Sequence, residues 1–569
     1  MNNMFFDDYF YQMQDLHDTG LYFKNKGKEQ FFSYPKVFKA SHQAGFFCTQ
    51  QGLDESDRLA LILPNTSEFV FIFLGAMAYG IIPCALYPPL RLGNLSSYKE
   101  KLKHQLNILK PKGLVTLKVL MPMLKSVVQS LDFDIKVFSP SDFFGENDFS
   151  ANRMHRRSAA FIQFSSGTTG EQKPVVITHE NLAHNVGAIV SSLGIDRKID
   201  SGVSWLPLYH DMGLVGGLFG ALASGATQTL LRPEEFLSNP KIWPQELSQK
   251  KASITVAPNF AFGLLSKKVT AEMAGLFDLS HLRIILCGAE MVQQKTVTGF
   301  LELFSHSKLK RQAFLPVYGM SEATLAVTFS SPEIGPIFNS FDRTSLEMNG
   351  KVLLESESSA QALKLTSVGR PLPGIEVQIL DQTGQRLGPQ MLGEIYIAGQ
   401  SIAEKYFTGE KVTNEADLLA TGDLGFFYRD DLYIYGRKKD LIIIRGRNID
   451  PSVVEKDLWS IKGVRPGKVV AIPDLDTQND TEGVAILFEQ EKKNKRPQGQ
   501  IEKDIMHALL ALHGISATKI KMIKSGILPR TSSGKLQRNL CQRFLLEDKK
   551  RPLMSYLKQL LPQGHNSKY

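Results

Sequence analysis

Cysteine is scarce in this chain, and the few cysteines lie far apart. The 569 residues include only Cys48, Cys84, Cys287 and Cys541, with no CxxC pair and no Cys/His spacing typical of metal ligands. This distribution argues against a zinc site and a disulfide framework, and it is typical of a reducing compartment. The first residues, MNNMFFDDYF, also lack the basic and apolar regions of a signal peptide. We therefore expect a cytoplasmic protein.

One uncharged run is long enough to require a check for a membrane span. Residues 69–86 (FVFIFLGAMAYGIIPCAL) carry no charge and are about as long as a minimal bilayer span. Gly75, Gly80 and Pro83 interrupt this run, and further prolines bracket it. A buried helix that leads into a core strand is the better interpretation, so we expect no transmembrane segment.

The basic clusters of the sequence lack aromatic residues. The net charge is +9, and Lys and Arg cluster at 153–157, 308–311, 492–496 and 549–551. A groove for single-stranded nucleic acid would interleave aromatic residues with such clusters, so we expect no nucleic-acid partner. Solvated surface is the favoured interpretation, and an acidic protein partner is the alternative.

The sequence does contain a mixed pattern of strands and helices. Short apolar runs predict buried strands, and the helical patterns between them predict helices on the faces of sheets, an α/β fold. Strands are expected at 59–63, 113–116, 160–164, 228–231, 284–287 and 393–398, and helices at 181–193 and 293–304.

The chain is too long for one ordinary core, so two or more domains are expected. The clearest boundary lies at 436–440 (GRKKD), which divides a large domain, 1–436, from a small one, 437–569. Residues 337–365 interrupt the strand-rich pattern and predict an inserted surface excursion. Within the small domain we expect strands at 441–444, 469–472 and 483–488, and a helix at 500–512.

Residues 161–175 (FIQFSSGTTGEQKPV) predict a strand followed by a Ser/Gly/Thr loop. The backbone N–H groups of such a loop can surround phosphate oxygens, and its hydroxyls add donors. It is not a Walker loop, because Lys173 lies three residues beyond Gly170. From these residues alone, a flexible polar turn is an equally open interpretation.

Four more segments complete a set that resembles the adenylate-forming superfamily of acyl-CoA synthetases, luciferases and peptide-synthetase adenylation domains. They are 317–324 (VYGMSEAT), 420–425 (ATGDLG), 436–455 (GRKKDLIIIRGRNIDPSVVE) and 529–538 (PRTSSGKLQR), in the order of that family. The resemblance implies a large N-terminal domain of packed sheets and helices that binds ATP and a fatty acid. It also implies a small, mobile C-terminal α+β domain.

The resemblance assigns roles to individual residues. Glu322 would hold the Mg²⁺ that bridges the ATP phosphates, since a hard cation prefers carboxylate oxygens. Asp423 would accept hydrogen bonds from the ribose. Other residues implied to bind ATP are Ser165, Ser166, Gly167, Thr168, Thr169, Gly170 and Lys173 at the phosphates, Gly288, Ala289, Glu290, Tyr318, Gly319, Met320 and Ser321 around the base, and Arg437 at the ribose.

The resemblance also implies catalytic and substrate-binding residues. Lys535 would stabilise charge at the α-phosphate, His210 would lie near the reacting carboxylate, and Lys439 would be the hinge of the small domain. A helix cap is the alternative role for Asp211. The implied substrate-binding residues are Trp205, His210, Asp211, Gly213, Gly217, Asn259 and Phe260.

A fatty carboxylate is already a nucleophile at neutral pH, so this chemistry needs no Ser/His/Asp constellation. Segments 204–217, 256–265 and 313–330, with the excursion, look most like the fatty acyl-AMP ligases. Members of that subfamily pass the acyl group to the phosphopantetheine of an acyl carrier protein or polyketide synthase. A long-chain fatty acyl-CoA ligase and a catalytically silent adenylate-binding scaffold are the alternatives.

Overall fold

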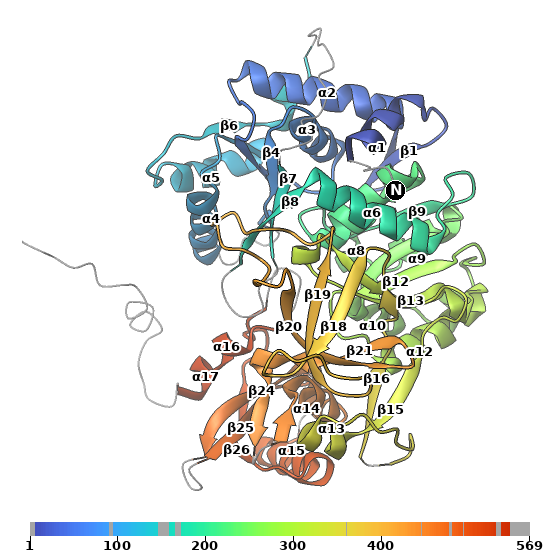
Figure 1. Cartoon of the computed structure of the whole chain (residues 1–569), viewed down its shortest axis with the longest axis vertical. Coiled ribbons are helices and arrows are strands. Elements are labelled where there is room, and N and C mark those ends of the chain that lie inside the picture. Colours follow the sequence, from blue (N-terminus) through green and yellow to red (C-terminus); the bar gives the residue numbers. More distant parts are fainter. Residues whose placement is uncertain are drawn as a thin grey trace, which may run out of the picture. The chain divides into compact units, whose positions relative to one another are not determined.

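The chain forms two compact units, one ending at Tyr435 and the other beginning at Gly436 (Figure 1). The computed structural model describes residues 6–89, 95–145, 159–165, 172–359, 361–444, 447–476, 481–492, 494, 496–530 and 536–546. Each unit has its own apolar core within these ranges.

A mainly parallel nine-stranded sheet is the largest layer of the first unit. Its order is β17-β14-β13-β12-β11-β9-β10-β1-β2, in which β13 to β1 run parallel and the edges are antiparallel. The bounds are β1 Gly20–Asn25, β2 Lys28–Ser33, β9 Ser201–Ser204, β10 Thr227–Leu230, β11 Ile254–Pro258, β12 Ile284–Gly288, β13 Phe314–Gly319, β14 Ala326–Phe329 and β17 Arg370–Pro371. Both faces of its central strands are buried, which explains uninterrupted apolar strands such as β12.

A second sheet has the order β6-β5-β3-β4-β7-β8, with β8 antiparallel to β7. Its strands are β3 Arg58–Ile62, β4 Ile82–Ala85, β5 Gly113–Thr116, β6 Lys136–Phe138, β7 Ala159–Phe164 and β8 Pro174–Thr178. A third sheet comprises β18 Ile375–Leu380, β19 Gly393–Gly399, β20 Leu419–Tyr428 and β21 Asp431–Arg437. Alternation of strands and helices confirms the predicted mixed α/β fold.

Helices of the first unit connect and cover these strands. They include α1 Phe6–Gln12, α2 Tyr34–Gln50, α3 Ser67–Ala78, α4 Leu95–Leu109, α5 Met121–Val128, α6 His179–Leu193 and α7 Gly220–Ser224. After them come α8 Pro233–Ser238, α9 Ile242–Gln249, α10 Asn259–Lys268, α11 Ala271–Ala274 and α12 Gln294–Phe304. Met212–Phe219 is a π-helix, a rare form that is frequent at functional sites.

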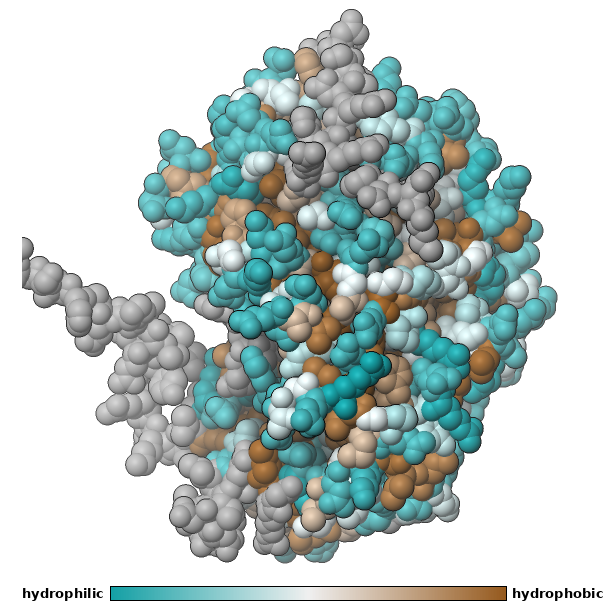
Figure 2. Space-filling view, viewed as in Figure 1, coloured by the Kyte–Doolittle hydropathy of each residue, from teal (hydrophilic) through white to brown (hydrophobic). Residues whose placement is uncertain are grey.

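The uncharged run at 69–86 forms the buried helix α3 followed by the core strand β4, as predicted. Helix α3 packs along α2 (Figure 1) and is buried on every side. In the described part of the chain, no helix is both long and apolar enough to span a bilayer. The face shown in Figure 2 is mostly hydrophilic, with small, separated apolar patches.

The excursion at 337–365 is more regular than the sequence predicts. Strands β15 (Phe338–Asp342) and β16 (Ala362–Thr366) pair antiparallel, and α13 (Arg343–Asn349) follows β15. Phe341 is fully buried, and its ring meets those of Phe426 and Tyr433 at 5.0 and 5.3 Å. Phe341 therefore docks the excursion against β20 and β21, whereas Leu353 and Leu354 of the same segment are half-exposed.

The second unit is built on the sheet β24-β25-β26, in which β24 and β25 are antiparallel and β26 is parallel to β25. Its helices pack on this sheet around a separate apolar core. The elements are β22 Ile442–Ile444, β23 Arg447–Ile449, α14 Pro451–Leu458, β24 Val464–Asp476, β25 Thr481–Gln490, α15 Gln498–His513, β26 Ala517–Ile523, α16 Arg538–Cys541 and α17 Arg543–Leu546.

A buried ion cluster joins three segments of the second unit. The Arg538 guanidinium donates to both Glu455 oxygens, at 2.9 and 2.8 Å, and to Asp440 Oδ2 at 2.9 Å. Asp450 lies close enough to interact with the same charges and caps α14 by accepting from the Ser452 backbone N–H at 2.8 Å. Burial raises the pKa of Asp450 to about 6, although Arg538 and Ser452 oppose the shift.

The free energy of unfolding of the wild type is expected to fall as the pH rises from about 4 to 6. Replacement of Asp450 by Asn should make this fall smaller. The folded protein holds the Asp450 proton more tightly than the unfolded chain, so ionisation in this window lowers the free energy of unfolding. The contribution is on the order of 2 to 3 kcal/mol, and asparagine can still cap the helix. Melting of wild type and Asp450→Asn from pH 4 to 7 measures it; parallel curves would contradict the assignment.

Candidate active site

Hydrogen bonds between Ser165 and Lys173 join the two ends of the predicted phosphate loop. The backbone N–H of Ser165 donates to the Lys173 carbonyl at 2.8 Å, and the Lys173 N–H donates back to Ser165 Oγ at 3.2 Å. The hairpin of β7 and β8 thus places the two ends of the loop side by side. The other loop residues of the prediction, Ser166, Gly167, Thr168, Thr169 and Gly170, lie outside the described residues.

Strands β13 and β20 hold Tyr318 and Asp423, two residues predicted to bind the nucleotide, and these side chains meet. The Tyr318 hydroxyl donates to Asp423 Oδ2 at 2.7 Å. Asp423 is buried, with only 6% of its surface exposed. At the end of β13, a Cβ on Gly319 would lie 2.0 Å from the Leu325 carbonyl oxygen, so only glycine fits. Met320 donates its backbone N–H to that same carbonyl at 2.8 Å.

Ser321 and Asp211 form a second link between predicted residues. Ser321 Oγ donates to Asp211 Oδ2 at 2.7 Å, while Asp211 Oδ1 accepts from the Met212 backbone N–H at 2.7 Å. Asp211 therefore caps the π-helix and ties it to the 317–324 motif. The backbone N–H of Leu214 donates to the His210 carbonyl at 2.8 Å, which places His210 at the start of the same helix.

The segment at 288–290 is a strained turn beside α10. Ala289 has φ 65°, a left-handed conformation that is uncommon for alanine, directly after Gly288 ends β12. Glu290 Oε1 accepts from the Phe260 backbone N–H in the first turn of α10. Asn259 Oδ1 accepts from the Gln293 N–H at 3.1 Å, so this turn and the start of α10 are joined twice.

Trp205 and Phe260, both predicted to contact substrate, share one aromatic group. The Trp205 ring stacks on Phe236 at 3.8 Å and meets Trp243 and Phe260 edge-on at 6.0 and 6.2 Å. Trp205 is buried, whereas Phe260 is 39% exposed, so Phe260 is the member of this group that a ligand can reach.

Close packing explains the glycines at 213–217. A Cβ at Gly213 would lie 2.2 Å from the Pro207 carbonyl oxygen, so the chain itself requires glycine there. A Cβ at Gly216 or Gly217 would meet Leu325 or Ser204 at 3.2 to 3.3 Å. A substrate role for Gly213 and Gly217 remains a prediction beside this packing role.

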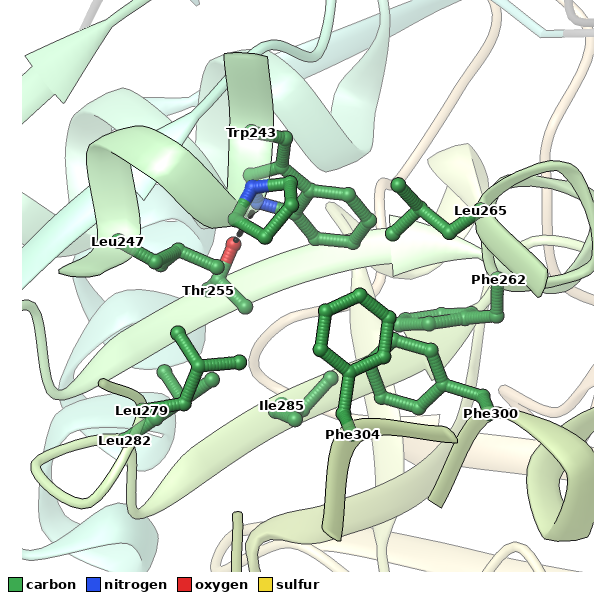
Figure 3. Close-up of a pocket in the computed structure, with 11 residues that line it drawn as sticks. Trp243, Leu247, Thr255, Phe262, Leu265, Leu279, Leu282, Ile285, Phe300 and Phe304 are labelled. Atoms are coloured by element: carbon green, nitrogen blue, oxygen red, sulfur yellow. Dashed lines mark hydrogen bonds between the residues drawn. The ribbon is translucent and has the colours of Figure 1, made fainter. Parts of the chain in front are cut away.

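An apolar cavity lies between β11, β12 and helices α9, α10 and α12 (Figure 3). Trp243 Nε1 donates to Thr255 Oγ1 at 2.9 Å on its wall. The space open to the centre of a water molecule is only about 10 Å³, room for a single water at most. Residues of 256–265 line it, but none of 204–217 does, so it is not a cavity shared by the two segments that hold the implied substrate-binding residues. Its lining is Trp243, Pro244, Leu247, Thr255, Phe262, Leu265, Leu279, Leu282, Ile285, Phe300 and Phe304.

The remaining predicted residues belong to the second unit. Arg437 is the last residue of β21, and Lys439 lies in the 3-10 turn Lys438–Asp440. Lys535 lies outside the described residues. Its flanks are described: Arg530 and Leu536 form a β-bridge, and the Gln537 N–H donates to the Pro529 carbonyl at 3.0 Å.

Sequence reasoning missed Tyr406 and Glu410. Lys173 Nζ forms an ion pair with Glu410 at 2.9 Å and lies 4.5 Å from the Tyr406 ring centroid. The Tyr406 hydroxyl donates to Glu322 Oε1 at 3.4 Å. These residues lie more than 200 positions from Lys173 in a segment without a chemical signature, so only the fold reveals them.

A model of the family described as "AMP-binding enzyme" matches residues 14–407 of the chain. The chain belongs to the AMP-binding enzyme family. This AMP-binding enzyme is 34% identical over 415 residues to a probable long-chain-fatty-acid–AMP ligase, FadD30, of Mycobacterium tuberculosis, covering 67% of this chain and 69% of that protein. It is 29% identical to the long-chain-fatty-acid–AMP ligase FadD32 of Mycolicibacterium smegmatis, covering 90% and 88%.

Solved structures show the same fold. A structure from a study of fatty acyl-adenylate ligases of E. coli and L. pneumophila superimposes with a TM-score of 0.87 at 28% identity, covering 95% of this AMP-binding enzyme and 97% of that chain. The match therefore includes both units of the chain.

Proposed function

We propose that this enzyme activates a long-chain fatty acid with ATP, forming the acyl-adenylate and releasing pyrophosphate. The observation that carries the proposal is the hydrogen bond of the Tyr318 hydroxyl to the buried Asp423 carboxylate, which joins two nucleotide motifs 105 residues apart. The names of the long-chain-fatty-acid–AMP ligases FadD30 and FadD32 support the acid substrate.

The reaction requires alignment and charge stabilisation more than proton transfer. A carboxylate oxygen bonds to the α-phosphorus as the bond to pyrophosphate breaks, and no proton moves, because a fatty acid with a pKa near 4.3 is already ionised. The loop closed by Ser165 and Lys173 would hold phosphates, and Asp423 would accept from the ribose. Lys535 would stabilise charge at the α-phosphate.

The residues present fit a magnesium ion shared with the nucleotide. Across the described residues, no group of three or more His, Cys, Asp or Glu side chains could hold a metal alone. Mg²⁺ typically takes one or two carboxylates and completes its shell with water and phosphate oxygens. Glu322, which is partly buried beside Tyr406, would supply that carboxylate, and the ion would neutralise phosphate charge.

We infer that a carrier-protein phosphopantetheine thiol receives the acyl group. The thiol attacks the acyl carbonyl and AMP leaves. The excursion that docks through Phe341 supports this assignment, because an insertion in the large domain marks the fatty acyl-AMP ligases. Coenzyme A is the competing acceptor.

Mass spectrometry of the products tests both steps. The protein is incubated with ATP, Mg²⁺ and a panel of acids, with no acceptor, with coenzyme A, or with a phosphopantetheinylated carrier protein. Acyl-AMP without acceptor and acylated carrier protein are expected, with little acyl-CoA. Efficient acyl-CoA synthesis would instead identify a coenzyme A ligase, and no acyl-AMP with any acid would refute the activity.

Replacing Asp423 by Asn is expected to weaken ATP binding about 10- to 100-fold. The charged acceptor is lost, and hydrogen bonds to charged groups contribute about 1.5 to 3 kcal/mol. Tyr318→Phe keeps the carboxylate and is expected to have the smaller effect. Calorimetric titration with ATP measures both, and an unchanged dissociation constant for Asp423→Asn would remove Asp423 from the nucleotide site.

A further inference from the structure

One short segment, residues 403–407, connects the carboxylate motif to the phosphate loop. The Ala403 backbone N–H donates to the Glu322 carbonyl at 2.8 Å. Four residues later, the Phe407 N–H donates to the Pro174 carbonyl at 2.7 Å, and Tyr406 forms a β-bridge with Val175. The segment is therefore bonded by its backbone to both motifs.

The side chain of Tyr406 also contacts both motifs, through one charged residue of each. Its hydroxyl donates to Glu322 Oε1 at 3.4 Å, and its ring lies under Lys173 Nζ at 4.5 Å. Glu410 holds the same ammonium at 2.9 Å, and its carbonyl accepts the Tyr406 N–H at 2.8 Å. One tyrosine thus contacts the predicted metal-binding carboxylate and the predicted phosphate-binding lysine.

The hydroxyl of Tyr406 is suited to a donor role. A phenol hydroxyl has one proton to donate, whereas an ionised carboxylate such as that of Glu322 can only accept. A partner that donates to a metal-binding carboxylate fixes the orientation of that carboxylate, and such partners strongly affect metal affinity.

We propose that Tyr406 is a positioning residue that orients Glu322 for Mg²⁺ through its hydroxyl and Lys173 for the nucleotide phosphates through its ring. The two halves of the side chain therefore serve different ligands. This inference rests on the proposed adenylate-forming function, because it assigns Glu322 and Lys173 the metal and phosphate roles of that reaction.

Two variants separate the two contacts. Tyr406→Phe removes only the hydroxyl and is expected to weaken Mn²⁺ or Mg²⁺ binding to the ATP complex on the order of tenfold. It should leave ATP binding without metal unchanged. Tyr406→Leu removes the ring as well and is expected also to weaken metal-free ATP binding several-fold, since Lys173 loses the ring face.

The measurements do not depend on turnover. Calorimetry gives ATP affinity in EDTA, and Mn²⁺ electron paramagnetic resonance gives metal affinity at saturating ATP. Tyr433→Phe is the matched control, because it also removes a phenol hydroxyl bonded to a side-chain oxygen, Asn339 Oδ1 at 2.7 Å. Its metal and nucleotide affinities should equal those of wild type.

The outcomes distinguish this inference from the function on which it rests. Tyr406→Phe with wild-type metal affinity would overturn the inference even if the enzyme forms acyl-AMP. A wild-type protein that binds ATP and metal but forms no acyl-AMP would refute the proposed function alone. Should Tyr406→Phe not fold, 3-fluorotyrosine incorporated at 406 provides the test. Its fluorine resonance must broaden when Mn²⁺ binds with ATP, and an unbroadened line overturns the inference.

Discussion

Lys535→Ala is expected to lower the rate of acyl-AMP formation about 10²- to 10³-fold while leaving the fold intact. Removal of one preorganised donor that stabilises transition-state charge typically has an effect of this size. The prediction depends on the motif PRTSSGK, which ends at this lysine. Pyrophosphate release in single-turnover experiments with saturating ATP and fatty acid measures the chemical step.

The second half-reaction is the internal control for Lys535. Transfer from supplied acyl-AMP to a carrier-protein thiol should be much less affected in Lys535→Ala, because the α-phosphate has already reacted. Lys492→Ala removes an exposed lysine of the same unit and should match wild type in both steps. Equal losses in the two half-reactions of Lys535→Ala would contradict a role specific to adenylation.

Dodecanoate is expected to be activated at least two orders of magnitude more efficiently than acetate. Each buried methylene contributes about 0.8 kcal/mol, or roughly a fourfold gain in affinity. Burial of only four of the additional methylenes would therefore give a factor of about 200. Phe260, half-exposed beside the buried Trp205, is an apolar surface that a chain can contact.

A series of acids from two to sixteen carbons, compared by kcat/KM, measures this preference. The logarithm should rise steadily with chain length until the apolar site is filled. Phe260→Ala should reduce the slope without changing the activity on acetate. Similar efficiency for acetate and dodecanoate would exclude a fatty-acid site.

Much of the fold could be predicted from local sequence pattern. Every strand expected from a short apolar run is present. Strands such as 113–116 and 284–287 lie inside parallel sheets, where both faces are buried and a strand reads as a continuous apolar segment. Strands β15 and β16 were missed, since FNSFD and ALKLT mix polar and apolar residues without a clean run. The π-helix was missed as well, because nothing in MGLVGGLF distinguishes it from an α-helix.

For the candidate site, local motifs predicted individual residues but not which of them contact one another. The motifs identified Tyr318, Asp423, Ser321 and Asp211, and the fold joins them in two hydrogen-bonded pairs. Which residues pair could not be predicted, because the partners lie 105 and 110 positions apart. The role proposed for Tyr406 could not be predicted for a different reason. It depends on contacts of both the backbone and the side chain with distant residues, which no local sequence pattern indicates.

The packing of Phe341 against β20 and β21 has a consequence for protein engineering. Phe341 belongs to a cluster with Phe426, Tyr428 and Tyr433, so excision of the whole hairpin would leave those rings facing water. Exchange of residues 337–365 between homologues would therefore have to preserve this aromatic packing. Leu354 forms a β-bridge with Phe341, and the Leu353 carbonyl accepts the Asp342 backbone N–H at 2.8 Å. Both leucine side chains are 53% exposed, so they can be exchanged one at a time without opening the aromatic cluster.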